Sequence, residues 1–142
     1  MTQIRHTGLV TRNLKKSFNF WCKLIGFRVK IKLVEKGRTI DKILGYKNVL
    51  VKTFKLKDKN NNLLELLYFC NSPKIKKNRI KAYSEGFTHI SLTVKDLNKL
   101  YKKLKKAKVM FNSEPVISAD GKVLITYCKT PEGSYLELVQ EL

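Results

Sequence analysis

An internal repeat constrains this chain most, because it predicts two copies of one folding unit. The segment His-Thr-Gly-Leu-Val-Thr-Arg-Asn-Leu at residues 6–14 is matched by His-Ile-Ser-Leu-Thr-Val-Lys-Asp-Leu at residues 89–97. Each copy later contains a similar strand, Leu-Leu-Glu-Leu-Leu at 63–67 and Tyr-Leu-Glu-Leu-Val at 135–139. The chain has two histidines, and each one begins a copy of the repeat.

Both copies have the pattern strand, helix and three strands. Apolar residues at helical spacing predict helices at 14–25 and 97–107, started by Asn13 and Asp96. Alternating or apolar runs predict strands in the first copy at 3–10, 27–34, 49–56 and 63–69. In the second copy they predict strands at 87–94, 109–111, 114–118, 123–129 and 135–142. The predicted fold class is α+β, with two βαβββ modules forming an open, curved mixed sheet and one helix packed behind each module.

The 142 residues suit a single domain. We expect module 1 at about 1–71, a linker at about 72–85 and module 2 at about 86–142. The spacing from histidine to glutamate is 65 − 6 = 59 in the first copy and 137 − 89 = 48 in the second. The difference of 59 − 48 = 11 residues is expected within 35–48, which contains a possible short helix at 39–44. This segment could be either a lid or an ordinary surface excursion.

The candidate site consists of His6, Glu65, His89 and Glu137. Any one of them alone could be structural. Strand alternation, however, places the histidines and glutamates on the polar faces of their sheets, opposite the leucine-rich faces that would pack beneath the helices. Two imidazoles and two carboxylates suit one divalent ion such as Zn, Ni, Co, Fe or Mn. The repeat therefore predicts a metal site where the two copies meet.

The formal charge of +19 raises the question of nucleic-acid binding. Five of the 30 basic residues are arginine and 30 − 5 = 25 are lysine, whereas arginine is the residue that forks onto phosphates and bases. The lysines are spread along the whole chain and form no aromatic-interleaved basic motif of the RNA-binding type. No specific nucleic acid is therefore expected, and a positive field that attracts anionic small molecules is favoured.

The basic linker has two interpretations. Its Lys74, Lys76, Lys77, Arg79 and Lys81 could attract an anionic, phosphate-bearing thioester, or could simply form a solvated segment. No apolar run is long enough to predict a membrane helix, and no signal peptide is expected. Cys22, Cys70 and Cys128 lack metal-site spacing and are expected to be buried thiols of a cytoplasmic protein.

Four segments together resemble the vicinal oxygen chelate superfamily, which includes glyoxalase I, methylmalonyl-CoA epimerase, bleomycin-resistance proteins and extradiol dioxygenases. They are the two repeated openings, Phe-Trp-Cys-Lys-Leu-Ile-Gly-Phe at 20–27, and Thr-Pro-Glu-Gly-Ser-Tyr-Leu-Glu-Leu-Val at 130–139. The resemblance implies a glyoxalase-like open barrel around one divalent metal, often within a homodimer. It also implies that His6, Glu65, His89 and Glu137 are the first to fourth metal ligands.

The ligand pattern is most similar to glyoxalase I and nearly as similar to the epimerase. The resemblance thus implies a metal-dependent lyase or isomerase, with Glu137 as the base and Glu65 as a second proton carrier. A non-catalytic drug-binding protein of the bleomycin-resistance type is the alternative, and a dioxygenase or a nucleic-acid-binding protein is less favoured. Glutathione is not expected as the co-substrate, because Val10 and Phe69 stand where bacterial glyoxalase I tends to carry arginine and asparagine.

Overall fold

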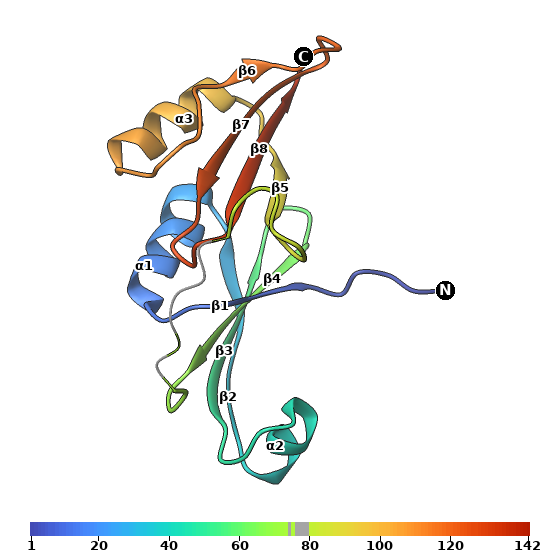
Figure 1. Ribbon diagram of the computed structural model, residues 1–142, viewed down its shortest axis with the longest axis vertical. Coiled ribbons are helices and arrows are strands. Elements are labelled where there is room, and N and C mark those ends of the chain that lie inside the picture. The colour runs from blue at the N-terminus through green and yellow to red at the C-terminus, as the bar shows by residue number, and fades with distance from the viewer. Residues whose placement is uncertain (74, 76–79) are drawn as a thin grey trace. The chain divides into compact units, whose positions relative to one another are not determined.

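The computed structural model describes residues 1–73, 75 and 80–142. The chain divides into two compact units, Met1–Lys76 and Lys77–Leu142. Over the described residues, the first unit contains a four-stranded sheet of order β1-β4-β3-β2 and the second a four-stranded sheet of order β5-β8-β7-β6 (Figure 1). In each sheet the first pair is parallel and the other pairs are antiparallel. The predicted α+β fold with two equivalent modules is confirmed.

The first unit contains four strands and their helical connections. Its elements are β1 (Thr7–Val10), α1 (Leu14–Phe18), η1 (Asn19–Ile25), β2 (Arg28–Lys36), α2 (Arg38–Leu44), β3 (Leu50–Lys57) and β4 (Leu63–Phe69). The first strand is shorter than the predicted 3–10. Thr7 pairs with Leu64, and β4 begins only at Leu63, so the residues before Thr7 have almost no neighbouring strand to pair with. His6 therefore lies just before β1.

The helix predicted at 14–25 is present but changes geometry halfway. Asn13 Oδ1 accepts a hydrogen bond from the Lys16 backbone at 3.0 Å, as expected of an N-cap. From Asn19 onward the helix is π-helical, and Gly26 ends it with φ 107°. The wider turn brings the consecutive residues Phe20 and Trp21 into the core together.

The core of the first unit lies on the leucine-rich side of its sheet. Trp21 is completely buried and contacts Phe20 and Phe27 edge to face, with ring centroids 5.1 and 5.8 Å apart. Phe18 packs on Phe54 of β3 at 4.9 Å. The sheet contributes the buried side chains Phe54, Leu56, Leu64 and Leu66. This is the face predicted to pack beneath the helix, which leaves the opposite face for the polar residues.

The extra length of the first copy forms a long β2 and the helix α2, where the second copy has only a two-residue β6. The Asp41 carboxylate of α2 accepts hydrogen bonds from the backbone of Asn48 and Val49, at 2.9 and 2.8 Å. Ile40 is buried in a cluster with Val49 and Val51. These contacts hold α2 at the end of the sheet (Figure 1).

The second unit follows the same order with shorter elements. They are β5 (His89–Thr93), α3 (Leu97–Lys106), β6 (Val116–Ile117), β7 (Val123–Lys129) and β8 (Tyr135–Glu141). Asp96 caps α3 by accepting a hydrogen bond from the Lys99 backbone at 2.8 Å, and Leu97 and Leu104 are buried. The strand predicted at 109–111 is wrong. Lys108 has φ 61°, which turns the chain, and Phe111 then makes only an isolated bridge with Cys128.

The prediction of three buried thiols holds for one of them. Cys128 is buried, Cys22 is half-buried, and Cys70 is exposed because it follows the end of β4. Burial raises the pKa of the Cys128 thiol to about 12. Among the described residues, no helix is long and apolar enough to cross a membrane.

A brief treatment of the folded protein with iodoacetamide at pH 8 should therefore modify Cys70 first and leave Cys128 untouched. The thiolate is the reactive form, and Cys128 is both buried and protonated at this pH. Peptide mass spectrometry would quantify each thiol, and the same treatment in denaturant provides the control in which all three react. Early modification of Cys128 in the folded protein would contradict the packing of β7.

Candidate functional site

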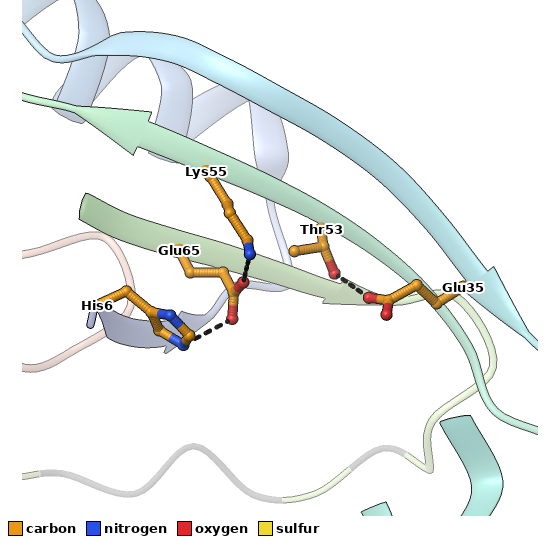
Figure 2. Close-up of polar contacts among 5 residues, drawn as sticks. All are labelled: His6, Glu35, Thr53, Lys55 and Glu65. Atoms are coloured by element: carbon orange, nitrogen blue, oxygen red, sulfur yellow. Dashed lines mark hydrogen bonds and ion pairs between the residues drawn. The ribbon is translucent and has the colours of Figure 1, made fainter. Parts of the chain in front are cut away.

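The first histidine and glutamate of the repeat meet at the polar face of the first sheet. Gly8 of β1 lies opposite Glu65 of the parallel strand β4, and His6 reaches the same carboxylate from just before β1. His6 Nε2 lies 3.3 Å from Glu65 Oε2 (Figure 2). The Glu65 side chain is only 13% exposed, so its charge is partly withdrawn from water.

A lysine contacts the other oxygen of the same carboxylate. Lys55 lies directly opposite Glu65 on the antiparallel strand β3, and its Nζ is 3.7 Å from Glu65 Oε1. Figure 2 shows His6 and Lys55 approaching Glu65 from different sides. The sequence analysis missed Lys55, because in Val-Lys-Thr-Phe-Lys-Leu-Lys at 51–57 lysine is the commonest residue and nothing marks one copy as special.

The polar face continues from β3 to β2. Thr53 lies two residues before Lys55 on β3 and therefore shares its face. Its hydroxyl donates a hydrogen bond to Glu35 Oε2 at 2.9 Å (Figure 2). Thr53 is buried, so this hydrogen bond satisfies a hydroxyl that water does not reach. Together His6, Glu65, Lys55, Thr53 and Glu35 form a polar row across the sheet.

The second unit repeats the arrangement of histidine and glutamate. Ser91 of β5 lies opposite Glu137 of β8, and His89 begins β5. His89 Nε2 lies 3.9 Å from Glu137 Oε2. Tyr127 of β7 is directly opposite Glu137, and its hydroxyl donates a hydrogen bond to Glu137 Oε1 at 2.7 Å.

The two glutamates differ in the partner that the neighbouring strand provides. Lys55 and Tyr127 are equivalent in the repeat, since 127 − 55 = 72 and 137 − 65 = 72. Burial, together with the hydrogen bond and the charge of Glu137, raises the pKa of Tyr127 to about 12. The phenol is therefore a neutral donor at physiological pH. Among the described residues no lysine or arginine pairs with Glu137, so its charge is not compensated as that of Glu65 is.

Both imidazole rings direct the same nitrogen toward the carboxylate. His89 Nδ1 shares a hydrogen bond of 2.9 Å with the Thr88 hydroxyl, which fixes the ring, and the ring packs on Tyr127 with centroids 5.4 Å apart. His6 Nδ1 is buried and has no hydrogen-bond partner within the described part of the chain.

A comparison with protein families agrees with this geometry. The model for the Glyoxalase/Bleomycin resistance protein/Dioxygenase superfamily matches residues 3–138. The chain belongs to this superfamily. The match spans both units and includes all four candidate ligands, so the resemblance predicted from the repeated motifs is confirmed.

Known proteins are similar to this chain over most of their length. The uncharacterized protein YwbC of Bacillus subtilis is 23% identical, over 97% of this chain and 97% of its own. A glyoxalase family protein from Bacillus cereus has a TM-score of 0.90 and 19% identity, covering 100% of this chain and 95% of that one. The trypanothione-dependent glyoxalase I of Leishmania major has a TM-score of 0.67 and 21% identity, covering 99% and 88%. At these identities the solved structures show the shared fold.

Superfamily members often use a divalent metal, and imidazole nitrogens and carboxylate oxygens are donor types that bind such an ion. Two ligand atoms that each lie about 2.0–2.2 Å from one ion are about 3.0–3.5 Å apart. The separation of 3.3 Å between His6 Nε2 and Glu65 Oε2 matches this range, and that of 3.9 Å between His89 Nε2 and Glu137 Oε2 requires a small side-chain shift. Within either unit, the described residues offer such a pair and no cluster of three His, Cys, Asp or Glu side chains.

Proposed function

We propose that this protein is a divalent-metal-dependent lyase or isomerase of the glyoxalase–epimerase type. The observation that carries the proposal is the repetition of the pair: each unit places histidine Nε2 within 4 Å of glutamate Oε2, at 3.3 Å in the first unit and 3.9 Å in the second. A single pair of this kind could be an ordinary surface contact. Two equivalent pairs, in a chain that belongs to a superfamily whose name includes glyoxalases, favour a common chemical role.

The residues that would hold the ion are His6, Glu65, His89 and Glu137. Imidazole and carboxylate donors suit Zn, Ni, Co, Fe or Mn. When bound, the ion would polarise a substrate carbonyl and stabilise the negative charge that develops when a neighbouring proton is removed.

Glu137 is the proposed base. Tyr127 holds Oε1 by a hydrogen bond of 2.7 Å, which fixes the orientation of the carboxylate, and no ammonium group of the described residues neutralises it. The carboxylate takes a proton from the carbon beside the substrate carbonyl, and the carboxylic acid so formed returns a proton to the product. Glu65, held by Lys55 on its other oxygen, is the proposed second proton carrier.

Lys55 also supports a second candidate function. Its ammonium group already provides a positive charge 3.7 Å from Glu65 Oε1, as expected if the pair in the first unit is satisfied without a metal. A glutamate that is neutralised without a metal is expected in a non-catalytic, small-molecule-binding protein of the bleomycin-resistance type. Metal content separates the two candidates.

Protein loaded with Zn²⁺, Ni²⁺, Co²⁺ or Mn²⁺ and then desalted should retain about one ion per chain by elemental analysis. The His6→Ala variant should bind that ion more weakly by at least about 10–100-fold, the loss that follows removal of even an outer partner of a metal ligand. Gln3→Ala, in the exposed segment just before His6, is the matched control and should load normally. Protein that retains no ion under any loading condition would overturn the metal-dependent proposal and favour the binding protein.

A further inference from the structure

A cleft in the first unit lies away from the histidine–glutamate pair and has its own chemistry. It has a volume of about 340 Å³ and is lined by Gly26, Arg28, Lys57, Asp58, Lys59 and Asn61. These residues come from the end of η1, the start of β2, the end of β3 and the turn that follows β3. The volume is at the small end of ligand sites, so the cleft suits a headgroup rather than a whole drug-sized molecule.

The charges of the cleft are unbalanced. Arg28, Lys57 and Lys59 contribute three positive charges and Asp58 one negative charge, which leaves 3 − 1 = +2. None of the three cations forms an ion pair with a carboxylate of the described residues. Lys57 Nζ donates a hydrogen bond to Asn61 Oδ1 at 3.4 Å, which keeps its ammonium group at the cleft.

Asp58 does not neutralise these cations, because the turn engages its carboxylate. Oδ1 accepts hydrogen bonds from the backbone N–H groups of Asn60 and Asn62, and Oδ2 accepts one from Asn62 Nδ2, all at 2.8 Å. The aspartate therefore shapes the Asp-Lys-Asn-Asn-Asn turn, and the cations face the cleft without a counter-ion from the chain.

Strand register connects the cleft with the polar row. Lys57 pairs with Arg28 on one side and with Leu63 on the other, while Lys55 pairs with Glu65. Lys55 and Lys57 are two residues apart on β3, so they share a face and their Cα atoms are separated by about 7 Å. A molecule with an anionic group in the cleft could extend along this face to Glu65.

We propose that the cleft of Arg28, Lys57 and Lys59 binds the phosphate or pyrophosphate group of a small molecule. Arginine presents a planar fork of donors to phosphate oxygens, and the two lysines add point charges, a combination that matches a dianion better than a single carboxylate. If the proposed function holds, this group anchors the substrate and presents its carbonyl to the pair of His6 and Glu65. The substrate class is then a compact phosphorylated carbonyl or thioester compound.

The basic linker was one expected site of attraction for anions, whereas the proposed phosphate site lies at the first sheet. Lys74, Lys76, Lys77 and Arg79 of the basic linker lie outside the described residues, and Lys81 places its ammonium group over the ring of Tyr83 at 5.4 Å. The cleft instead gathers its cations on two paired strands and a turn with a fixed conformation.

Titration of the whole protein with inorganic pyrophosphate, in the presence of EDTA and without added metal, tests the cleft directly. Calorimetry should detect binding to the wild type, and amide NMR shifts should map it to residues 26–28 and 57–61. The double variant Arg28→Gln/Lys57→Gln should bind pyrophosphate about 10- to 100-fold more weakly, because charge-assisted hydrogen bonds are lost. Far-UV circular dichroism would verify that the variant is folded.

The control is Lys102→Gln/Lys105→Gln on the exposed side of α3, which removes the same two charges from the second unit. It should bind pyrophosphate within about twofold of the wild type, since diffuse charge is screened by salt. The proposed phosphate site would be overturned if both double variants bound pyrophosphate equally weakly. It would also be overturned if the wild type did not bind millimolar pyrophosphate. The titration contains no metal, so it tests the cleft independently of the proposed enzyme. If the protein binds pyrophosphate but cannot be loaded with metal, the phosphate site stands and only the proposed enzymatic function is rejected. Normal metal loading without pyrophosphate binding would reject only the cleft.

Discussion

Replacing Glu137 with glutamine is expected to slow the exchange of substrate C–H hydrogen with solvent by about 10²–10⁴-fold, the usual contribution of a general base. Glutamine has the shape of glutamate and keeps a carbonyl oxygen that can accept the Tyr127 hydrogen bond of 2.7 Å. It cannot take up a proton at neutral pH. The fold should therefore persist while the proton transfer is lost.

The measurement is deuterium incorporation from heavy water into candidate 2-hydroxy thioesters and methylmalonyl-type thioesters, followed by NMR. Glu141→Gln is the control, because Glu141 ends the same strand, is exposed, and loses the same charge. It should exchange at the wild-type rate. An unchanged rate in metal-loaded Glu137→Gln would assign the base to another residue. If the metal-loaded wild type exchanges none of these compounds, the non-catalytic binding protein becomes the better interpretation.

The repeat was enough to predict the fold and to relate each histidine to the glutamate near which it lies in the structure. An eighty-three-residue offset aligns His6 with His89 and Asn13 with Asp96, and both of the latter cap a helix in the structure. Alternation in Leu-Leu-Glu-Leu-Leu placed Glu65 on the polar face, and the pairing of Gly8 with Glu65 and of Ser91 with Glu137 confirms that placement. This pattern can be recognised in a sequence because burial of one face of a strand places apolar residues at every second position.

The partners of the two glutamates were not predictable, because they depend on the register between strands. Lys55 is one of many lysines, and only its pairing opposite Glu65 distinguishes it from Lys52, which pairs with Tyr68 and so lies on the other face. Tyr127 is likewise identified by its position opposite Glu137. The cleft of Arg28, Lys57 and Lys59 was hidden for the same reason, since its cations come from two strands and a turn.

The start of the first strand could not be predicted from the local sequence alone. The sequence predicted a strand from residue 3, but strand formation before Thr7 requires a partner, and β4 begins too late to provide one. His6 consequently approaches Glu65 from a segment that is not part of the sheet. Because His6 is not held by strand pairing, its position depends on how the sheet packs on the core beneath it.

That core gives the largest expected effect on stability. Trp21→Ala should lower the free energy of unfolding by about 3–5 kcal/mol, the cost typical of removing a large aromatic side chain from a core. Trp21 is 0% exposed and its ring contacts those of Phe20 and Phe27, so the deletion leaves a cavity lined by aromatic edges. Urea denaturation followed by far-UV circular dichroism is the suitable measurement, because Trp21 is the only tryptophan in the chain.

Tyr46→Ala is the matched control in the same unit, since this aromatic ring is 72% exposed and its removal should change stability by less than about 0.5 kcal/mol. Trp21 belongs to the π-helical η1, where two consecutive aromatic residues enter the core, so no neighbouring side chain can rotate to replace it without vacating its own position. A loss below about 1 kcal/mol would mean that Trp21 is not buried against Phe20 and Phe27 as described.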